Sequence, residues 1–454
     1  MLFSPRALYR ASRLAITATM ASMPDSLTRS GDIPALSSLT QAEFKLDTAG
    51  TIWSELLALA RQPGICNLGQ GYPDYAGSKV AREAASQAMM EPTMSAMNQY
   101  SLPPGLKSLQ ESVCTYYNKR YQLEEGAAKR AIASENVLIT IGATEGLYAS
   151  IKALVGPGDE VLIFNPGFPW YLSTTRLAGA TPVLVELSGP DFAPDMEKVE
   201  KAITPKTRAL LLNTPHNPCG HCYTKKELEG FARLALKYNL FVISDEVYEN
   251  VTFGGVEHLR IADEEGMFER TVTLCSASKL FSLTGWRVGW ALSTPSLLKG
   301  LAVYHVSTSY CAPSPLQHGL AVALDAEDGS FEDIPKLVEG NAQVLGDVLR
   351  EKGFIVSQPQ ASKKKIGGHF LVADTTPLGL KGLECAKLLL TQAKVSVVPG
   401  IIFYFADPKA TEGGNDDSGM DSDRPLLRFA ICKQRATIEE AARRIRATEL
   451  PAPK

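Results

Sequence analysis

Short apolar segments alternate with helix-like segments from residue 137 onward, and this alternation constrains the fold more than any other feature of the chain. The apolar runs cover residues 137–140, 160–164, 182–185, 209–212, 241–244 and 271–274. Most are separated by segments in which apolar residues recur with helical spacing, such as residues 226–238. Such alternation predicts an α/β fold with a largely parallel central sheet covered by helices on both faces. Ligands on sheets of this kind gather outside the carboxyl ends of the strands.

The composition is that of a globular chain without a general affinity for nucleic acid. The 454 residues are 45% hydrophobic and 21% charged, which is enough for two domains. The net charge of -3 offers nucleic acid no general attraction. We find no helix-turn-helix and no zinc-ligand spacing, and we assign no metal ligand. No uninterrupted apolar stretch is long enough to cross a bilayer.

The eight cysteines do not suggest a disulfide scaffold in a chain of this length. Cys219 and Cys222 have the spacing of a thiol–disulfide exchange motif, but without the expected small thioredoxin-like context. They also overlap Asn217-Pro218-Cys219-Gly220, a run that better fits a ligand-binding loop at a strand end.

Lys279 follows the apolar run 271–274, and Ser276, Ser278 and Arg287 lie close to it in the sequence. An amine in a low-dielectric pocket loses affinity for its proton and can form a Schiff base with an aldehyde. Serine hydroxyls and a guanidinium group suit a phosphate. Together these groups predict a site for pyridoxal phosphate. The alternative is a lysine at a strand end followed by an ordinary helix start.

Polar side chains also follow two neighbouring runs. Asn217, after residues 209–212, can donate its amide to a phenolate oxygen. Asp245 follows residues 241–244, and a carboxylate that faces a pyridine nitrogen keeps this nitrogen protonated, which makes the ring a better electron sink. Tyr248, three residues later, can donate a hydrogen bond to the ring oxygen. Aspartate at a strand end is otherwise a common helix cap.

Small and aromatic residues follow the first two runs. Gly142-Ala143-Thr144 opens a helix, and the free backbone N–H groups at a helix start favour an anion, although an ordinary capped helix is the alternative. Phe168 can stack on a flat pyridine ring, whereas we expect Trp170 to serve in packing.

The segment from Ser276 to Trp290, with Gly-Trp-Arg-Val-Gly at 285–289, resembles the lysine segment of the class I aminotransferases, which are fold-type-I pyridoxal-phosphate enzymes. The run Asn-Leu-Gly-Gln-Gly-Tyr-Pro-Asp at 67–74 looks like the substrate-side loop of the kynurenine aminotransferase and glutamine transaminase K branch. The resemblance covers residues 50 to 445 and includes the specific Asn-Pro-x-Gly motif that begins at Asn217.

The resemblance implies a role for each candidate residue. The expected cofactor contacts are Ala143, Thr144, Phe168, Asn217, Asp245, Tyr248, Ser276, Lys279 and Arg287, of which Asp245, Tyr248 and Lys279 are also expected to act in catalysis. The expected substrate contacts are Gly71, Trp53, Asn217 and Arg428, with the α-carboxylate held by the planar fork of Arg428. An ordinary turn at Gly71, an exposed or packed Trp53 and a structural ion pair at Arg428 are the alternatives.

Tyr100 matches the tyrosine that reaches the cofactor phosphate of the partner subunit in that family, which implies a homodimer with shared active sites. A packed core tyrosine is the alternative.

The implied activity is transfer of an amino group from an L-amino acid to a 2-oxo acid, in ping-pong fashion through pyridoxamine phosphate. Kynurenine, aromatic amino acids, methionine or glutamine are the donors that the branch resemblance suggests. The alternative is a β-lyase that eliminates a sulfur leaving group from cysteine S-conjugates on the same site.

Residues 1–24 contain Arg6, Arg10 and Arg13 but no acid, a composition typical of a transit peptide. We expect a mitochondrial protein, with plastid and cytoplasm as alternatives. We further expect residues 25–70 to be a linker with an N-terminal arm or helix of the small domain. Residues 71–315 should form the large cofactor-binding domain, and residues 316–454 a small α+β domain with strands from residue 368, over 395–404 and over 426–430.

Overall fold

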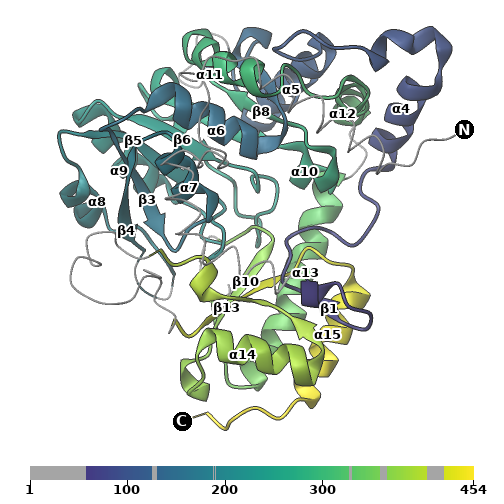
Figure 1. The fold of residues 1–454 in the computed structure, drawn as a ribbon, viewed down its shortest axis with the longest axis vertical. Coiled ribbons are helices and arrows are strands. Elements are labelled where there is room, and N and C mark those ends of the chain that lie inside the picture. Colours follow the sequence, from purple (N-terminus) through teal and green to yellow (C-terminus); the bar gives the residue numbers. More distant parts are fainter. Residues whose placement is uncertain are drawn as a thin grey trace, which may run out of the picture. The chain divides into compact units, whose positions relative to one another are not determined.

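Seven strands form the larger sheet of the protein, seen in a computed structural model (Figure 1). Their order across the sheet is β2-β8-β7-β6-β5-β3-β4. Neighbours among β3 to β7 pair in parallel, whereas β8 is antiparallel to both β2 and β7. The strands are β2 (Val137–Thr140), β3 (Glu160–Asn165), β4 (Thr181–Glu186), β5 (Thr207–Asn213), β6 (Phe241–Asp245), β7 (Thr271–Ser276) and β8 (Gly289–Leu292). The predicted α/β class is confirmed.

The structure describes residues 58–124, 130–187, 189, 191–326, 330–357, 366–405 and 424–453. All of them belong to one compact unit, Glu43–Lys454. The expected transit peptide and Trp53 lie outside the described residues. The domain boundary at residue 315 stays a prediction. No helix among the described residues is long and apolar enough to span a membrane.

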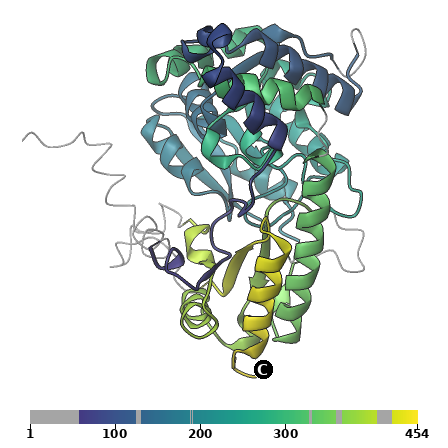
Figure 2. The same ribbon diagram turned by 90° about the vertical axis from the view of Figure 1, so that its right-hand side faces the viewer.

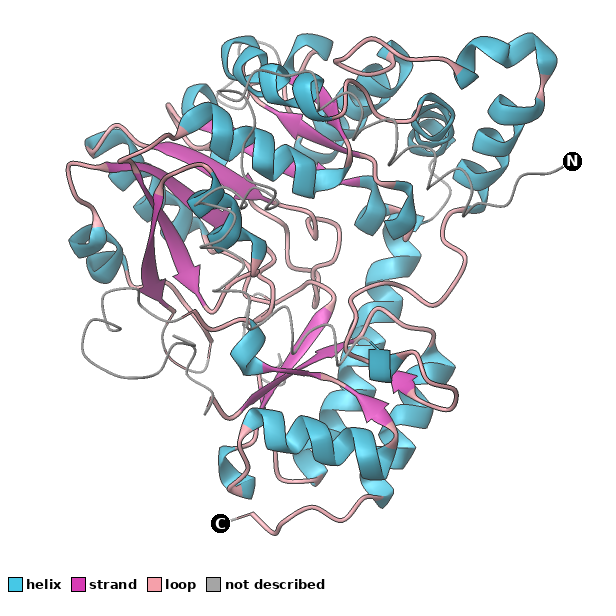
Figure 3. Cartoon of the chain, in the orientation of Figure 1, coloured by secondary structure: helices cyan, strands magenta, loops and turns pink. Residues whose placement is uncertain are grey.

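Helices cover both faces of the large sheet, as Figure 3 shows. Consecutive strand residues point to opposite faces, so Ile163 packs beside α6, α7 and α11, while Leu162 packs beside α8 and α9. At the β2–β8 end, α5 and α12 cover the second face. The helices are α4 (Lys79–Met90), α5 (Lys107–Tyr121), α6 (Gly142–Leu154), α7 (Trp170–Leu177), α8 (Met196–Ala202), α9 (Lys225–Lys237), α10 (Ala277–Leu280), α11 (Pro295–Thr308) and α12 (Ser314–Ala326).

The C-terminal part of the chain forms a second sheet of four strands, in the order β12-β13-β10-β9, which we call the small sheet. Its strands are β9 (Ile355–Val356), β10 (Phe370–Asp374), β12 (Val398–Pro399) and β13 (Leu426–Ala430). Helices α13 (Ser330–Glu351) and α15 (Arg435–Ala447) lie side by side against it (Figure 2), and α14 (Gly382–Leu388) packs near β12. The buried positions of α15, at 438, 441, 442 and 445, form one apolar stripe.

The expected strand over residues 395–404 is wrong in its extent. β11 (Val395–Ser396) pairs with β1 (Cys66–Asn67) in a separate two-stranded sheet, and only β12 joins the four-stranded sheet. Pro399, which has no N–H to donate, ends β12, and residues 400–402 form a 3₁₀ turn. The pairing of β1 with β11 ties the glycine-containing loop at 67–74 to the C-terminal part of the chain.

Candidate active site

The carboxyl ends of three neighbouring parallel strands bring the predicted polar residues to one edge of the large sheet. Asn213 at the end of β5 is in register with Asp245 at the end of β6, and the Asn213 side chain donates to the Asp245 carbonyl at 2.9 Å. Asp245 is in register with Leu274 of β7, two residues before the strand ends at Ser276. The cluster expected from the strand-and-helix pattern is therefore present.

Lys279 lies in α10, directly after β7, and is half-buried. Its Nζ donates a hydrogen bond to the carbonyl oxygen of Gly71 at 2.9 Å. Burial lowers the pKa of Lys279 to about 8, and the nearby guanidinium groups of Arg428 and Arg287 act in the same direction. The amine is thus much easier to deprotonate than an ordinary lysine, as a nucleophile requires.

Asp245 is buried, and burial raises the pKa of its carboxyl group to about 6. The Tyr171 hydroxyl opposes this effect, because it donates to Asp245 Oδ2 at 2.6 Å and so stabilises the carboxylate. The Val247 N–H donates to Oδ1 at the longer distance of 3.3 Å. The sequence analysis missed Tyr171, although it follows Phe168 by three residues and therefore lies one turn away at the start of α7.

Phe168 lies between two other aromatic rings. Its centroid is 4.9 Å from Trp170 in a stacked arrangement and 5.5 Å from Tyr171 in an edge arrangement. Phe168 is half-buried and Trp170 exposed, so Trp170 packs on the outer side of the Phe168 ring. Through Tyr171, Phe168 lies near the carboxylate of Asp245, where an aromatic ring could stack on a flat cofactor.

An anion cradle forms where α6 begins. Gly142 has a φ of +71°, and a Cβ there would lie 2.6 Å from Nη2 of Arg287, so the guanidinium group packs directly over the start of the helix. Ala143 and Thr144 follow in the first turn, where backbone N–H groups lack helical partners. Gly289 of β8 also approaches closely, because its Cβ would lie 2.9 Å from the Ala143 nitrogen.

The two serines near Lys279 differ in their bonding. Ser276 Oγ accepts a hydrogen bond from the Ser278 N–H at 3.2 Å and caps α10. The buried Ser278 Oγ has no hydrogen-bond partner among the described residues. A buried hydroxyl without a partner costs free energy, so an anion bound beside it would supply the missing acceptor.

Arg428 extends from β13 of the small sheet and is buried. It donates to Asn217 Oδ1 at 3.1 Å and to the Gly69 carbonyl at 2.8 Å. Its guanidinium carbon lies 3.9 Å from the ring centroid of Phe370 and 4.4 Å from that of Phe403. Because Lys279 donates to Gly71 and Arg428 to Gly69, two cations from different sheets converge on one three-residue segment.

Tyr248 closes the site between the two sheets. Its ring is buried, and the ring centroid lies 5.6 Å from Lys279 Nζ and 5.1 Å from the ring of His369. His369 was not predicted. Its imidazole is buried, and burial together with the charge of Lys279 lowers the pKa of His369 well below its usual range.

Lys433 is a second residue that sequence reasoning missed. Its buried Nζ donates to the Tyr72 carbonyl at 2.7 Å and lies 4.1 Å from the centroid of the Tyr72 ring. It lies three residues after the end of β13, the strand of Arg428. Lys433 fixes the loop whose carbonyl oxygens at Gly69 and Gly71 receive the two site cations.

One predicted site residue lies apart from the others within a single chain. Tyr100 is 84% exposed, which excludes the packed core tyrosine. Its ring makes an edge contact with Tyr310 at 5.5 Å, and in the part of the chain that the structure describes no contact links it to Lys279 or Arg428.

His216 and Cys219 lie near the site but are poorly suited to catalysis. Burial lowers the pKa of His216 to about 3, so its imidazole has too little affinity for a proton to suit the role of general base. Burial also raises the pKa of the Cys219 thiol, which disfavours the thiolate that disulfide exchange requires.

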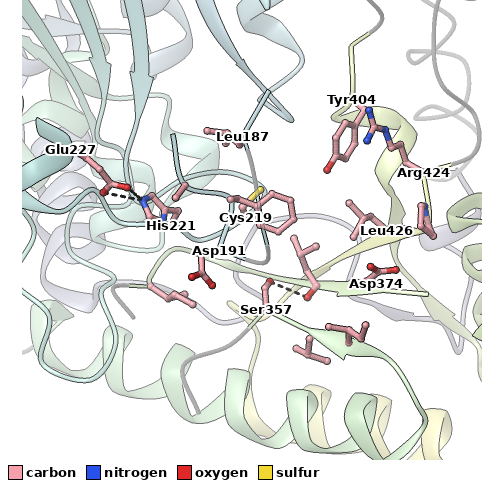
Figure 4. Close-up of a pocket in the computed structure, with 18 of the residues that line it drawn as sticks. Leu187, Asp191, Cys219, His221, Glu227, Ser357, Asp374, Tyr404, Arg424 and Leu426 are labelled. Atoms are coloured by element: carbon pink, nitrogen blue, oxygen red, sulfur yellow. Dashed lines mark hydrogen bonds and ion pairs between the residues drawn. The ribbon is translucent and has the colours of Figure 1, made fainter. Parts of the chain in front are cut away.

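A cavity of about 800 Å³ lies between loops that follow strands of the large sheet and the four-stranded sheet (Figure 4). Cys219, Tyr404 and Leu426 line it, and the same three residues line a small cavity that reaches Arg428. On its wall, Nε2 of His221 is hydrogen-bonded to Oε1 of Glu227 at 3.1 Å. The cavity therefore adjoins the site on the Arg428 side.

A buried amine with an easily lost proton, a buried carboxylate opposite a stacking ring, and an anion cradle on a doubly covered parallel sheet define the class of pyridoxal-phosphate-dependent transferases. The family model for aminotransferase class I and II matches residues 63–445, and the chain belongs to this family. It is an aminotransferase with pyridoxal phosphate as cofactor.

Several named proteins are similar to it. Kynurenine–oxoglutarate transaminase 3 of Homo sapiens is 32% identical over 423 residues, which is 87% of each chain. The solved structure of N-succinyldiaminopimelate aminotransferase from Mycobacterium tuberculosis matches with a TM-score of 0.79 and 34% identity, over 91% of this chain and 99% of that one. YbdL from Escherichia coli, described with a methionine aminotransferase function, matches with a TM-score of 0.79 and 26% identity, over 91% and 100% of the two chains.

Proposed function

We propose that this aminotransferase takes its amino group from an L-amino acid of the kynurenine, aromatic, methionine or glutamine type and passes it to a 2-oxo acid. The convergence of Lys279 and Arg428 on the carbonyl oxygens of Gly71 and Gly69 is the observation that carries this proposal. A nucleophilic amine and a carboxylate-binding fork at one short segment are what an α-amino acid substrate requires.

The residues present fit the cofactor. Lys279 provides the amine, Asp245 a carboxylate for the ring nitrogen, and Ser278 a buried hydroxyl that lacks a partner among the described residues. Pyridoxal phosphate supplies an aldehyde for an amine to capture and a ring that accepts electrons from the substrate α-carbon. The groups that would hold its phosphate are Ala143, Thr144, Ser276 and Arg287.

Lys279 has two tasks in this proposal. Its amine would hold the cofactor at the aldehyde carbon, and Nζ, when free, would carry the proton that leaves the substrate α-carbon. The half-buried position and the lowered pKa keep a useful fraction of the amine unprotonated near neutral pH. Gly71 offers a carbonyl acceptor that orients Nζ whenever the amine is free.

Arg428 would bind the substrate α-carboxylate. Its guanidinium plane is fixed by Phe370 and Phe403, and by hydrogen bonds to Asn217 and Gly69. A fixed planar fork binds a carboxylate with two parallel hydrogen bonds and loses little entropy in doing so.

Aromatic rings around Arg428 support an apolar or aromatic donor. Phe370 and Phe403 face the guanidinium group, and Tyr72 lies in the loop that follows Gly71. Such surfaces favour large apolar side chains over small or charged ones. The named relatives, which act on kynurenine, methionine and an acylated diamino acid, span a range of side chains that includes this class.

A donor and acceptor panel with product masses tests the activity. We expect kynurenine, phenylalanine, methionine or glutamine to give its 2-oxo acid only when an acceptor oxo acid is present. The matched control is Lys279→Ala, which should give no product. Release of pyruvate and ammonia from a cysteine conjugate without an acceptor would support the lyase instead. Turnover restricted to acylated diamino acids would contradict the proposed donor class.

We further propose a homodimer in which Tyr100 reaches the partner's site. Large apolar side chains are exposed near this residue in the sequence and on residues 303–310, whose Tyr310 ring contacts that of Tyr100; we refer to them as the exposed patch. Monomeric proteins rarely expose so many large apolar side chains together, which supports a second copy as the cover. The patch consists of Met89, Met90, Tyr100, Leu102, Val303, Val306 and Tyr310.

We also propose that residues 1–24 direct the protein to mitochondria. The support is compositional, since Arg6, Arg10 and Arg13 occur without any acid before Asp25. A fluorescent protein fused after residue 45 should enter mitochondria, whereas the same fusion with the three arginines replaced by glutamate should stay in the cytoplasm. Uniform cytoplasmic fluorescence of the unaltered fusion would contradict this.

A further inference from the structure

We propose that Tyr171 is a positioning residue for the reaction, because its hydroxyl holds one oxygen of Asp245 and leaves the other to face the ring nitrogen of the cofactor. This inference rests on the proposed role of Asp245. The O···O distance of 2.6 Å lies at the short end for a hydroxyl that donates to a carboxylate. Neither the motifs nor the family resemblance points to Tyr171.

The backbone fixes Tyr171 firmly. It lies in the first turn of α7, beside β3 in Figure 1, where its N–H donates to the Phe168 carbonyl at 3.1 Å and its own carbonyl accepts from the Thr175 hydroxyl at 2.7 Å. The side chain is buried in the apolar cluster under α6 and α7. The phenol ring is therefore held in place with its hydroxyl directed at Asp245.

The same aromatic group joins two functions. Phe168, the candidate stacking ring, contacts Tyr171 edge-on at 5.5 Å. One turn of chain thus presents two groups: the Phe168 ring for the face of the cofactor, and the Tyr171 hydroxyl for the Asp245 carboxylate. A shift of α7 would move both at once, so their mutual geometry is set by a single helix start.

The negative charge of a buried carboxylate explains why Asp245 needs the Tyr171 hydroxyl as a hydrogen-bond donor. A buried carboxylate tends to take up a proton, and burial raises the pKa of Asp245. The Tyr171 hydrogen bond opposes that tendency. Burial and the adjacent carboxylate raise the pKa of Tyr171 itself well above its usual range, so the phenol keeps its proton and remains a donor. An ionised Asp245 leaves the shared proton on the ring nitrogen, which the electron-accepting role of the ring demands.

The test titrates the visible absorption of the holoenzyme against pH in four proteins: wild type, Tyr171→Phe, Asp245→Asn and the control Tyr223→Phe. Tyr223 is an equally buried tyrosine, and in the described part of the chain no hydrogen bond joins its hydroxyl to the Asp245 carboxylate. A ring nitrogen that loses part of its positive charge withdraws fewer electrons, so the titration midpoint should rise. We expect a rise of about 0.5 to 1 pH unit in Tyr171→Phe and a larger one in Asp245→Asn.

The loss of kcat among the four proteins should follow the same order as the rise in their titration midpoints. In Tyr171→Phe, kcat should fall about tenfold, whereas KM for the amino donor should change less than about twofold. The reason is that the lost hydrogen bond acts through Asp245 on the cofactor ring and not on substrate binding. Tyr223→Phe should match the wild type in both arms. A purely structural role for Tyr171 would lower thermal stability but leave the absorption midpoint in place, which would overturn the proposal.

Two further results keep the outcomes distinct. If Asp245→Asn titrates like the wild type, the proposed role of Asp245 fails; if only Tyr171→Phe does, the role of Tyr171 alone fails. Should Tyr171→Phe fold poorly, 3-fluorotyrosine at position 171 provides a second variant. Its more acidic hydroxyl donates more strongly, so the midpoint should fall, and an unchanged or raised midpoint would overturn the inference.

Discussion

Burial of charged side chains gives this site its chemistry. Lys279, Asp245 and Arg428 are each removed from water to a degree that shifts the pKa toward the neutral form. Removal of a charged group from water is costly unless the group is paired and hydrogen-bonded. The three groups come from α10, β6 and β13, and each retains hydrogen-bond partners that fix its position.

The first residue-scale prediction concerns the fork of Arg428. In Arg428→Lys the charge remains but the bidentate geometry is lost, and kcat/KM for amino-acid donors should fall about 10- to 100-fold, which corresponds to roughly 1.5–3 kcal/mol for a charged hydrogen bond. Arg443→Lys, an exposed arginine of α15, is the control. An equal loss with an amine that lacks a carboxylate would show that Arg428 does not bind this group.

The second residue-scale prediction concerns pH. Only the unprotonated amine of Lys279 can attack an aldehyde, so capture of pyridoxal phosphate by the apoprotein should accelerate about tenfold per pH unit and level off above pH 8. The rate should level off at a lower pH than for a free lysine, because the pKa of Lys279 in the folded protein lies below the free value of about 10.4. The reaction of Nα-acetyllysine, which has a free ε-amine, with pyridoxal phosphate should keep accelerating to about pH 10 when measured in parallel. The same behaviour in the protein would contradict a lowered pKa.

At the scale of elements, the loop at residues 66–74 is hydrogen-bonded to the C-terminal part of the chain. The Leu68 N–H donates to the Ser396 carbonyl at 2.9 Å, and the Ala430 N–H donates to the Leu68 carbonyl at 2.6 Å. Asp74 accepts from the Gln434 N–H at 2.6 Å. Lys279 of α10 donates to this loop at Gly71, so any displacement of the C-terminal part of the chain would carry the Lys279 acceptor with it.

Gly71→Ala tests the fit of that loop. A Cβ there would lie 2.4 Å from Cζ of Phe370, so the loop or the ring must move. Overpacking of this kind costs about 1–3 kcal/mol, and we expect a lower melting temperature together with a fall in kcat/KM of about tenfold or more. Gly156→Ala, where nothing lies within 4 Å of the added carbon, should change neither. Normal activity in Gly71→Ala would show that the loop is not tightly fitted.

The sequence predicted the central strands well because parallel strands are buried on both faces and read as continuous apolar runs. The runs at 137–140 and 271–274 agree with β2 and β7 to within two residues. β8 was missed because Gly289 and Trp290 were interpreted only as part of the lysine segment. Periodicity carries no information on which strand pairs antiparallel at an edge.

The site was predictable where a residue follows a strand end or matches a family motif, as Lys279 and Asp245 do. Tyr171, His369 and Lys433 could not be found in this way, because their significance lies in partners far along the chain. The hydrogen bond from Tyr171 to Asp245 spans 74 residues, and that from Lys433 to Tyr72 spans 361. Such contacts depend on packing between elements rather than on local pattern.

At the scale of the whole molecule, the exposed patch around Tyr100 predicts that active sites are shared between two chains. Mixing Tyr100→Ala with Lys279→Ala chains should restore activity, since a mixed dimer contains one site with both groups intact. Half of randomly formed dimers are mixed and one of their two sites is complete, so about a quarter of the wild-type activity should return. Two unmixed variants set the baseline. No recovery after confirmed exchange of chains would place Tyr100 outside the partner's site.

Lys279 is assigned as the residue that captures the cofactor, and reductive trapping tests this central claim directly. The holoenzyme is treated with borohydride, digested and sequenced by mass spectrometry. We predict that the reduced cofactor is found on Lys279 alone, and that no lysine of the Lys279→Ala variant carries it. A cofactor adduct on another lysine, above all on the buried Lys433 near the same loop, would contradict the assignment.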